Sequence, residues 1–470
     1  MLLRRKLDRF AALTAAFLLA ACTTPVGPQE SGLSVPAAWN QLQKSPPLTG
    51  DASAQVEHDW WKHFRDPTLD ALVEEALANN KSLQVAKARV DEARADRGVA
   101  RAALFPEVDA TGSVSRGNQG FLTQKRTVNI AQGELEASWE VDLFGRNQAR
   151  TAEATAILES EDAASQAVRV ELLAEVARNY FDLRNYERQL VLTRANLDTQ
   201  QKTLELTRVQ LQGGFASDFD VQRAGAQVST TAALIPVLQT SYDASLNRLN
   251  ILLGYPPGTK DALLKTPAEL QPLDNQVLVA APATVLKTRP DVRTAERRFA
   301  ASISAKDAAT AELFPDVSLT ALFGVQGGSG FGAAPWSIGA GLVQPILNFG
   351  RIESEINAAD ARQRQSYLTY QQTVLEALEN MEDALSSYVQ ENTRNVSLAT
   401  SVDQTRKAAD LANQQYTNGF TSLLDLLVAE RDLLNAEASQ AASDASLRKD
   451  LVAIYTAAGG GWSDANTTAR

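Results

Sequence analysis

The feature that most constrains this chain of 470 residues is a pattern that occurs twice in its sequence. Asp-Leu-Phe-Gly-Arg ends at Arg146, and Leu-Asn-Phe-Gly-Arg ends at Arg351, 205 residues later. Further pairs are 104–108 with 313–317 (Leu-Phe-Pro-Glu/Asp-Val), 214–217 with 419–422, Asp220 with Asp425, and Gly254 with Gly459. Chance similarity between two Ala-rich regions would not preserve order together with an offset of 205 or 209 residues. We therefore predict a tandem structural repeat.

Each copy has the pattern of a helix, a strand, a loop, a strand, a long helix, a glycine turn and a last helix. The first copy is predicted at 61–270, with helix 69–103, hairpin 106–143 (loop 117–129), long helix 146–212, tip turn 213–217 and a helix to 254. The second is predicted at 284–462, with helix 284–312, hairpin 315–347 (loop 326–335), long helix 351–417, tip turn 418–422 and a helix to 459. A linker at 271–283 joins the copies, and 463–470 is predicted to be a disordered tail.

The strands predict a sheet with one polar and one apolar face. Between residues 134 and 143 the two kinds of side chain alternate strictly, with Leu135, Ala137, Trp139, Val141 and Leu143 on the apolar side. Strands of about 10 residues suit a tilted membrane-spanning strand. We expect Glu134, Glu136, Glu140 and Asp142 to face a water-filled lumen. Four strands cannot close a barrel, which needs at least about 8, so several chains must share one.

The helices indicate a wall of coiled coils. Residues 146–212 contain no proline and would span roughly 100 Å at 1.5 Å per residue. Large apolar residues recur there at every seventh position, which is typical of a coiled-coil seam: Val176, Leu183, Leu190, Leu197, Leu204 and Leu211. The two shorter helices of each copy add up to about the length of its long helix, so we expect them to stack end to end beside it.

The N-terminus predicts export and lipid attachment. A basic start and an apolar run at 11–21, too short to span a bilayer, predict a signal peptide at 1–21. The run ends at Cys22, the only cysteine, in a context that resembles a bacterial lipobox. We therefore expect Cys22 to carry N-acyl (palmitate) and diacylglycerol groups, and 22–60 to form an extended tether. Thr23 occupies the place where an Asp would signal inner-membrane retention, which favours the outer membrane.

Composition and motifs argue against several other classes of protein. A net charge of -11 disfavours binding to nucleic acid phosphates. The only histidines are His58 and His63, and no metal-binding, nucleotide-binding or nucleophile motif occurs. We predict that the protein is not an enzyme and has no catalytic residue, metal or other cofactor.

Together these residues resemble the outer membrane factor family, the TolC-like exit ducts of tripartite efflux pumps and type I secretion systems. The resemblance extends from about residue 60 to 462 and is greatest to the NodT-type efflux lipoprotein branch. It depends on Trp60 together with 61–80 (in sum Trp-Trp-Lys-His-Phe-Arg-Asp-Pro and the following helix), 289–292 (Arg-Pro-Asp-Val) with 295–296 (Ala-Glu), and the Leu-Phe-Pro and Phe-Gly-Arg pairs.

This resemblance implies a mostly α-helical fold with a membrane β-barrel. A homotrimer would give four strands per protomer to a barrel of twelve, and the long helices would continue it as a tunnel across the periplasm. The expected location is therefore the outer membrane, with contact to its lipids and extension into the periplasm. The expected partners are a periplasmic adaptor (membrane fusion) protein and an inner-membrane transporter of the resistance-nodulation-division (RND) type.

The resemblance also assigns the glycine turns to the periplasmic tips. Residues expected to contact the adaptor are Gly213, Gly214, Ser217, Gly419 and Ser422. Leu424 and Asp425 lie where relatives have a hydrophobic constriction and an aspartate ring, which suggests a periplasmic gate. Alternatively, Leu424 packs in a helix seam and Asp425 is a helix N-terminal charge. Some relatives carry a second Asp one turn further, where this chain has Val428.

The function expected from the resemblance is a passive outer-membrane exit duct that exports drugs or other small toxic compounds. One alternative is a duct for type I protein secretion, since the wall of a duct does not reveal its cargo. The other is a non-conducting coiled-coil lipoprotein that acts as a spacer. Cys22→Ser distinguishes the spacer, which would leave the membrane, from a duct, which would remain there.

Overall fold

A computed structural model describes residues 27–41, 48–50, 56, 58–119, 126–266, 270–273, 277–328 and 331–462. The predicted signal peptide at 1–21, the lipidation site Cys22 and the tail at 463–470 lie outside these residues. In the described part, no helix is both long enough and apolar enough to cross a membrane.

The chain forms two compact units that do not coincide with the two predicted repeats. Unit 1 comprises 1–33, 87–164 and 293–373, and unit 2 comprises 34–86, 165–292 and 374–470. Each unit thus takes matching segments from both copies, so 61–270 and 284–462 are repeats of sequence but not separate compact bodies. The physical reason is that segments of the two copies pack against each other within a unit, as strand 126–141 of the first copy does when it pairs with strand 316–328 of the second.

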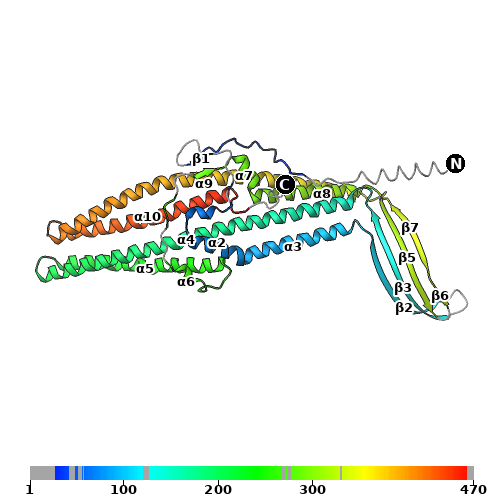
Figure 1. The fold of residues 1–470 in the computed structure, drawn as a ribbon, viewed down its shortest axis with the longest axis horizontal. Helices are drawn as coiled ribbons and strands as arrows, with labels where there is room; N and C mark the ends of the chain where they lie inside the picture. Colours follow the sequence, from blue (N-terminus) through cyan, green and yellow to red (C-terminus); the bar gives the residue numbers. More distant parts are fainter. Residues whose placement is uncertain are drawn as a thin grey trace. The chain divides into compact units, whose positions relative to one another are not determined.

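Unit 1 contains an antiparallel sheet (Figure 1). Its strands are β2 (Glu107–Gln119), β3 (Arg126–Val141), β5 (Asp316–Gly328), β6 (Phe331–Ala333) and β7 (Trp336–Val343). Strand β3 pairs with β2 and β5, and β5 also pairs with β6 and β7. The loops predicted at 117–129 and 326–335 were too long, because β2 and β3 extend into the first and β6 lies in the second. The segment Arg-Thr-Val-Asn-Ile at 126–130 is rich in strand-forming residues, which explains the extension.

Pairing of the strands aligns the two faces across the whole sheet. Leu135 lies opposite Ala110 on β2 and Phe323 on β5, and Phe323 in turn lies opposite Trp336 on β7. Because residues directly opposite each other share a face, the apolar positions of all four long strands form one surface. Glu134 and the other residues of its parity form the second surface.

The predicted long helices are confirmed at both ends. They are α4 (Arg146–Gln212) and α9 (Arg351–Thr417), each of 67 residues. Gly145 and Gly350 precede them with φ of 79° and 82°, a left-handed conformation that glycine adopts without strain. The duplicated Phe-Gly-Arg sequence is therefore the corner at which a strand turns into a long helix. The last helices of the copies are α5 (Asp218–Leu252) and α10 (Leu423–Ala457).

The opening helix of each copy is two helices, which corrects the predictions at 69–103 and 284–312. They are α2 (Pro67–Asn79) and α3 (Lys81–Ala102) in the first copy, and α7 (Pro282–Thr288) and α8 (Pro290–Ala311) in the second. Asn80 and Arg289 separate them in extended conformation, with ψ of 130° and 121°. Arg289 precedes a proline, which excludes the helical region sterically, and Asn80 accepts a hydrogen bond from the Leu83 amide as a helix cap.

The residue at each helix break forms a hydrogen bond to the C-terminal end of the last helix of the same copy. Asn80 Nδ2 donates to the Leu252 carbonyl at 2.8 Å, and Arg289 Nη1 donates to the Ala457 carbonyl at 2.9 Å. Residues 252 and 457 differ by 205, and residues 80 and 289 differ by 209. The structure thus confirms the tandem repeat through a contact made at equivalent positions by two different side chains.

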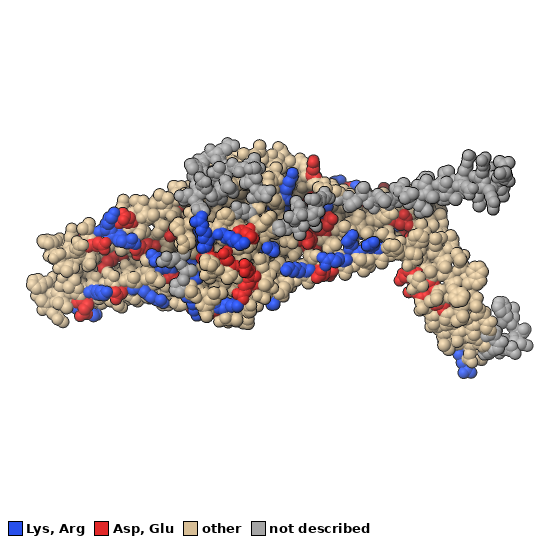
Figure 2. Space-filling view, viewed as in Figure 1, with Lys and Arg blue, Asp and Glu red and all other residues tan. Residues whose placement is uncertain are grey.

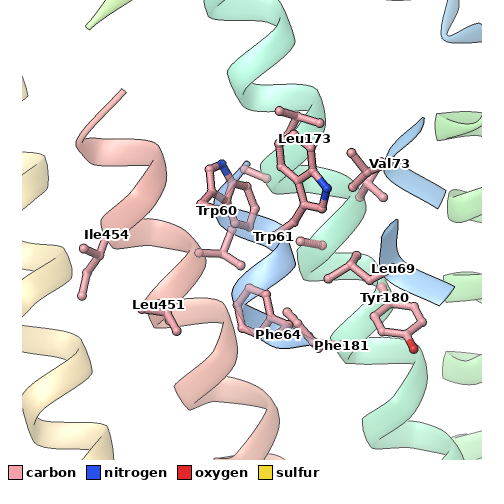
Figure 3. Close-up of a cluster of buried hydrophobic side chains, with 14 of the residues drawn as sticks. Trp60, Trp61, Phe64, Leu69, Val73, Leu173, Tyr180, Phe181, Leu451 and Ile454 are labelled. Atoms are coloured by element: carbon pink, nitrogen blue, oxygen red, sulfur yellow. The ribbon is translucent and has the colours of Figure 1, made fainter. Parts of the chain in front are cut away.

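The main core lies in unit 2 and includes the Trp-Trp segment (Figure 3). A 3-10 helix, η1 (Trp60–Phe64), inserts both tryptophans and Phe64 among side chains of α2, α4 and α10. Trp60 is fully buried and stacks on Tyr455 at 5.5 Å between ring centroids. The aromatic segment that contributed to the family resemblance is therefore a packing element.

Parts of the tether and the linker pair with each other. Strand β1 (Leu48–Gly50) lies parallel to β4 (Val277–Val279) in a two-stranded sheet that sequence analysis did not predict. Nearby in the chain, Trp39 is buried and donates from Nε1 to the Ala280 carbonyl at 2.8 Å. The described part of the tether is thus held by specific contacts.

Candidate functional site

The apolar face of the sheet is exposed, as expected for a surface that contacts lipid. Val114, Trp336 and Ile338 have 86%, 72% and 80% of their surface accessible. The other large exposed side chains of this face are Val108, Leu135, Leu319, Phe323, Val325 and Leu342. A contiguous apolar surface of this extent on a single chain indicates contact with a membrane or with another protein.

The polar face carries the predicted acidic residues in two groups. Glu134 lies opposite Thr111, and Glu136 lies opposite Asp109, on the open sheet. Figure 2 shows acidic atoms on the half of the sheet that adjoins its helices, whereas Lys and Arg are scattered mainly over the helices.

Glu140 and Asp142 instead bind the start of α4. Glu140 accepts a hydrogen bond from the Arg146 side chain at 2.6 Å, and Asp142 accepts one from the backbone amide of Gln148 at 2.7 Å. Strand β3 ends at Val141, so Asp142 lies at the corner and not in the strand. These two carboxylates have a local partner that alternation alone did not predict.

The space around glycines of the sheet shows that side chains are packed more closely on the polar face than on the apolar face. A Cβ atom added at Gly341 would lie 2.9 Å from Ser318 Oγ, and one at Gly339 would lie 3.1 Å from Thr320 Oγ1. On the apolar face, a Cβ at Gly112 or Gly133 would meet no atom closer than 3.9 Å. Side chains converge on the concave side of a curved sheet, so this asymmetry indicates curvature toward the polar face.

The two tip turns have the same structure. Gly214 and Gly419 end the long helices with φ of 78° and 75°. The following amides, of Phe215 and Phe420, donate to carbonyls five residues back at 2.7 and 2.8 Å. This is the glycine-dependent motif that commonly ends helices.

A capping box starts the helix after each turn. Ser217 pairs with Asp220, and Ser422 pairs with Asp425, through reciprocal side-chain and backbone hydrogen bonds. The predicted tip residues Ser217 and Ser422 are therefore helix caps in each copy, and Gly213 precedes the first of the two left-handed glycines.

The structure gives Asp425 a local role. Its carboxylate accepts hydrogen bonds from Ser422 Oγ at 2.6 Å, Thr421 Oγ1 at 3.0 Å and the Ser422 amide at 3.3 Å. The Ser422 hydroxyl is the main cause that lowers the pKa of Asp425 below its ordinary value. Within a single chain, capping of α10 therefore accounts for an acid at this position.

Leu424 is not part of the packed seam of the chain. It is 45% exposed, whereas its neighbours Leu423, Leu426 and Leu427 belong to a buried cluster at the tips. The alternative that Leu424 packs in a seam of its own chain is therefore not supported.

Sequence analysis missed three exposed aromatic residues at the tips. Phe215, Phe219 and Phe420 are 88%, 65% and 82% exposed. The first and third follow the left-handed glycine in each copy, so the repeated Gly-Phe pair was the signal that could have identified them.

A duplicated helical hairpin joined to a sheet with one exposed apolar face defines the class of TolC-like outer-membrane channels. Solved structures agree. The outer-membrane channel OprN superposes with a TM-score of 0.85 at 34% identity, over 93% of this chain and 100% of that one. The MtrE channel of Neisseria gonorrhoeae superposes with a TM-score of 0.80 at 26% identity, over 94% and 98%.

Comparisons of sequence identify the family. The family model described as outer membrane efflux protein matches residues 72–255 and 281–460, one copy of the repeat each. Nodulation protein T of Rhizobium leguminosarum bv. viciae is 32% identical over 97% of this chain and 94% of its own length. The pyoverdine export outer membrane protein OpmQ of Pseudomonas aeruginosa is 30% identical over 97% and 98%. The chain belongs to the outer membrane efflux protein family.

Membership in this family confirms the predicted fold, the outer-membrane location and the role in efflux. The matched family is one of outer membrane efflux channels, which is compatible with the prediction that the chain is not an enzyme. The groups of His, Cys, Asp and Glu in the described residues include none that could hold a metal ion.

Proposed function

We propose that this chain is one protomer of a passive exit duct formed by three copies. The duct would receive small toxic compounds from an inner-membrane transporter of the RND type through a periplasmic adaptor. The proposal rests on the sheet, which is apolar and exposed on one face and polar and crowded on the other; among the described residues, the outer edges of β2 and β7 have no strand paired to them.

The open edges favour closure between copies. Strands β2 and β7 form the two edges, and successive antiparallel pairing through β3 and β5 makes them antiparallel to each other. β7 of one copy can therefore pair with β2 of the next and continue the same pattern. Such head-to-tail contacts close into a ring when the rotation allows it. Three copies, the number implied by the family resemblance, would supply twelve strands.

The helices of unit 2 also have apolar surface that neighbouring copies would cover. On α5, Leu234 and Val237 are 45% and 65% exposed. On α9, Val396 and Leu411 are exposed to a similar degree. These side chains support helix contacts between copies that accompany the strand contacts.

The tips are proposed to bind the adaptor and to contain the gate. The adaptor would contact the two turns at Gly213, Gly214, Ser217, Gly419 and Ser422, with the exposed Phe215 and Phe420 as apolar anchors. Leu424 is exposed in one chain and would meet its copies around a three-fold axis. A ring of Asp425 carboxylates there would attract cations.

The lipid anchor is proposed at Cys22. The tether is held in unit 1 at Gly27 and Ser31, where Arg297 donates to the Gly27 carbonyl at 3.3 Å and Tyr367 donates to the Ser31 carbonyl at 2.9 Å. Five residues of extended chain reach at most about 18 Å. Cys22 would therefore stay close to the unit that carries the sheet, as an anchor in the same membrane requires.

Small compounds are the proposed cargo. Relatives of similar length are named for pyoverdine export and for antibiotic and toluene efflux. These names favour small compounds over protein secretion. Membership in a channel family disfavours the non-conducting spacer.

Two adjacent residues of β7 allow a matched test of the two faces. Ile338 lies on the apolar face and Ser337 on the polar face. Ile338→Lys should reduce the amount of protein in the outer membrane and abolish drug resistance in cells that lack their own duct, since a lipid-facing Lys costs about 2–4 kcal/mol at the midplane. Ser337→Lys should insert normally and lower the cation selectivity of single channels in planar bilayers. Equal effects of the two variants would refute a lipid-facing apolar side.

A further inference from the structure

A polar cluster is buried between the two repeats, where α10 contacts α4. It contains Glu430 of α10 and Asn196, Gln200 and Thr203 of α4. Glu430 is 4% exposed and Gln200 is 1% exposed. A carboxyl group at such depth is uncommon unless a partner compensates its charge.

Hydrogen bonds connect the members of this cluster. Thr203 Oγ1 donates to Glu430 Oε1 at 3.0 Å, and Gln200 Nε2 donates to Asn196 Oδ1 at 2.6 Å. Asn196 Nδ2 lies 3.4 Å from the Glu430 carbonyl oxygen. The cluster therefore joins the second repeat to the first about two turns from the start of α10.

Two oxygen atoms of the cluster lack a donor among the described residues. They are Glu430 Oε2 and Gln200 Oε1, and both are buried. Each buried acceptor without a partner costs about 1–3 kcal/mol. An ionised carboxylate can only accept, so it could satisfy neither atom.

Exchange of the oxygen and nitrogen positions in the two side-chain amides does not supply the missing donors without bringing oxygen atoms together. Exchange of O and N in Gln200 would turn two oxygens toward each other, because its present donor lies 2.6 Å from Asn196 Oδ1. Exchange in Asn196 as well would turn its oxygen toward the Glu430 carbonyl. Each of these exchanges would therefore leave two oxygen atoms facing each other with no hydrogen between them.

Charged groups on the surrounding helices do not supply a counter-ion for Glu430. Many charged groups of α4, α5, α9 and α10 are engaged in pairs, caps or ring contacts of their own, among them Lys202 with Asp198, Arg208 with Glu205, Asp220 with Ser217, Arg223 with Phe219, Lys407 with Asp403, Arg406 with Glu437, and Arg431 with Asp432. Asp410 of α9 lies near Arg406. Burial raises the pKa of Glu430, and the hydrogen bond from Thr203 only partly opposes this.

We propose that Glu430 carries a proton on Oε2 and that this neutral carboxyl is a latch between α10 and α4. The protonated oxygen becomes the missing donor, and Gln200 Oε1 is the buried acceptor that still needs one. Separation of the helices would admit water, ionise the acid and release the proton. The inference concerns the folded chain and does not depend on the proposed cargo, partners or gate.

Protonation of Glu430 is linked to the contact between α10 and α4, and this linkage sets the direction in which the contact responds to pH. In the closed state the two helices are in contact, and in the open state they are separated. The closed state holds the proton to a higher pH than the open state, in which Glu430 has an ordinary pKa near 4.3. Between the pKa values of Glu430 in the open and closed states, each rise of one pH unit should increase the ratio of open to closed molecules by up to about tenfold. Above the pKa of the closed state, the ratio stops changing.

Infrared spectroscopy tests the protonation directly. In the full protein in detergent at neutral pH, the wild-type spectrum should contain a protonated carboxylic acid band that disappears in Glu430→Gln. Glu437→Gln is the matched control, because Glu437 lies on the same helix but is paired with Arg406 at 2.6 Å. Its spectrum should keep the band. A band of equal size in wild type and Glu430→Gln would overturn the proposal.

Hydrogen exchange tests the latch. After correction for intrinsic rates, exchange of amides in residues 423–437 should increase with pH in the wild type and in Glu437→Gln, but not in Glu430→Gln. Exchange that instead depends on whether Na⁺, K⁺ or choline is the cation would show a bound ion in place of the proton and contradict the inference. The Gln variant retains a donor and the volume of the side chain, so loss of folding is not expected to obscure the result.

Discussion

The two repeats build the same helix junction with different chemistry. In the first, the neutral amide of Asn80 holds the end of α5, whereas in the second the guanidinium of Arg289 holds the end of α10. Arg289 also forms a two-point contact with Asp291. What both junctions retain is a helix end and a left-handed glycine, Gly254 or Gly459, against the break. The backbone geometry of the junction was thus kept after duplication, whereas the side chain that makes the contact was free to change.

The last helices differ more than the junctions do. α10 buries residues along its whole length, whereas α5 leaves Leu234 and Val237 exposed. Glu430 of α10 corresponds to Gly225 of α5, 205 residues earlier. Within unit 2, α10 thus packs along more of its length than α5 does, and the buried acid Glu430 has no counterpart on α5.

The largest expected effect comes from adding a methyl group at the junction glycines. In Gly254→Ala the new carbon would overlap the Asn79 carbonyl oxygen, and in Gly459→Ala it would lie 3.0 Å from Arg289 Cα. Backbone atoms cannot move aside easily. We therefore expect Gly254→Ala to lower the free energy of unfolding by about 3 kcal/mol and Gly459→Ala to lower it by less. Thermal unfolding in detergent measures both. A larger loss for Gly459→Ala would contradict this order.

The side chains at the junctions should have the next largest effects. Arg289→Met removes the contacts to Ala457 and Asp291 and should cost about 2–3 kcal/mol, since a buried carbonyl loses its donor. Asn80→Ala should cost about 1–2 kcal/mol because it removes one such donor and a helix cap. Exchange of the two side chains should also give unequal results. We expect Asn80→Arg to be as unstable as Asn80→Ala, whereas Arg289→Asn should be more stable than Arg289→Met. Differential scanning calorimetry measures all four variants.

Loss of the tip caps should be smaller and equal in the two repeats. Ser217→Ala and Ser422→Ala each remove the hydroxyl that caps α5 or α10 and should cost about 1 kcal/mol. Hydrogen exchange at the first turn of each helix is the readout. An effect confined to one tip would show that the two turns are not equivalent.

Acidification should give the smallest effect. Hydrogen bonds from Ser217 and Ser422 hold the pKa values of Asp220 and Asp425 below their ordinary range. A lowered pKa in the folded state means that the contribution to stability is present above about pH 4 and is lost as the pH falls through the folded-state values. Helix-end exchange should therefore increase at both tips in acid, and replacement of both residues by Asn should remove that change.

The sequence sufficed for much of the fold because its strongest signals are local. Alternation predicted the faces of β3, and the glycines before Arg146 and Arg351 marked the starts of α4 and α9 to the residue. The break at Asn80 was missed because it depends on a contact with Leu252, 172 residues away. The pairing of β1 with β4 was missed for the same reason, since three-residue strands have no pattern of their own.

The candidate site was only partly predictable. The acidic residues of β3 were assigned to one face by alternation, but the capture of Glu140 by Arg146 depends on the corner geometry. Asp425 has the same sequence signature whether it caps a helix or lines a pore. Glu430 could not be singled out, because a Glu on a long helix is ordinarily exposed and only the packing of α4 buries it.

The native mass of the Cys22→Ser protein, measured by light scattering after extraction from outer membranes, tests most directly whether several copies build one barrel. If copies share one barrel through the free edges of β2 and β7, the particle contains three chains and stays in solution only with detergent. A monomer or dimer that remains soluble without detergent would contradict the shared barrel and with it the proposed duct.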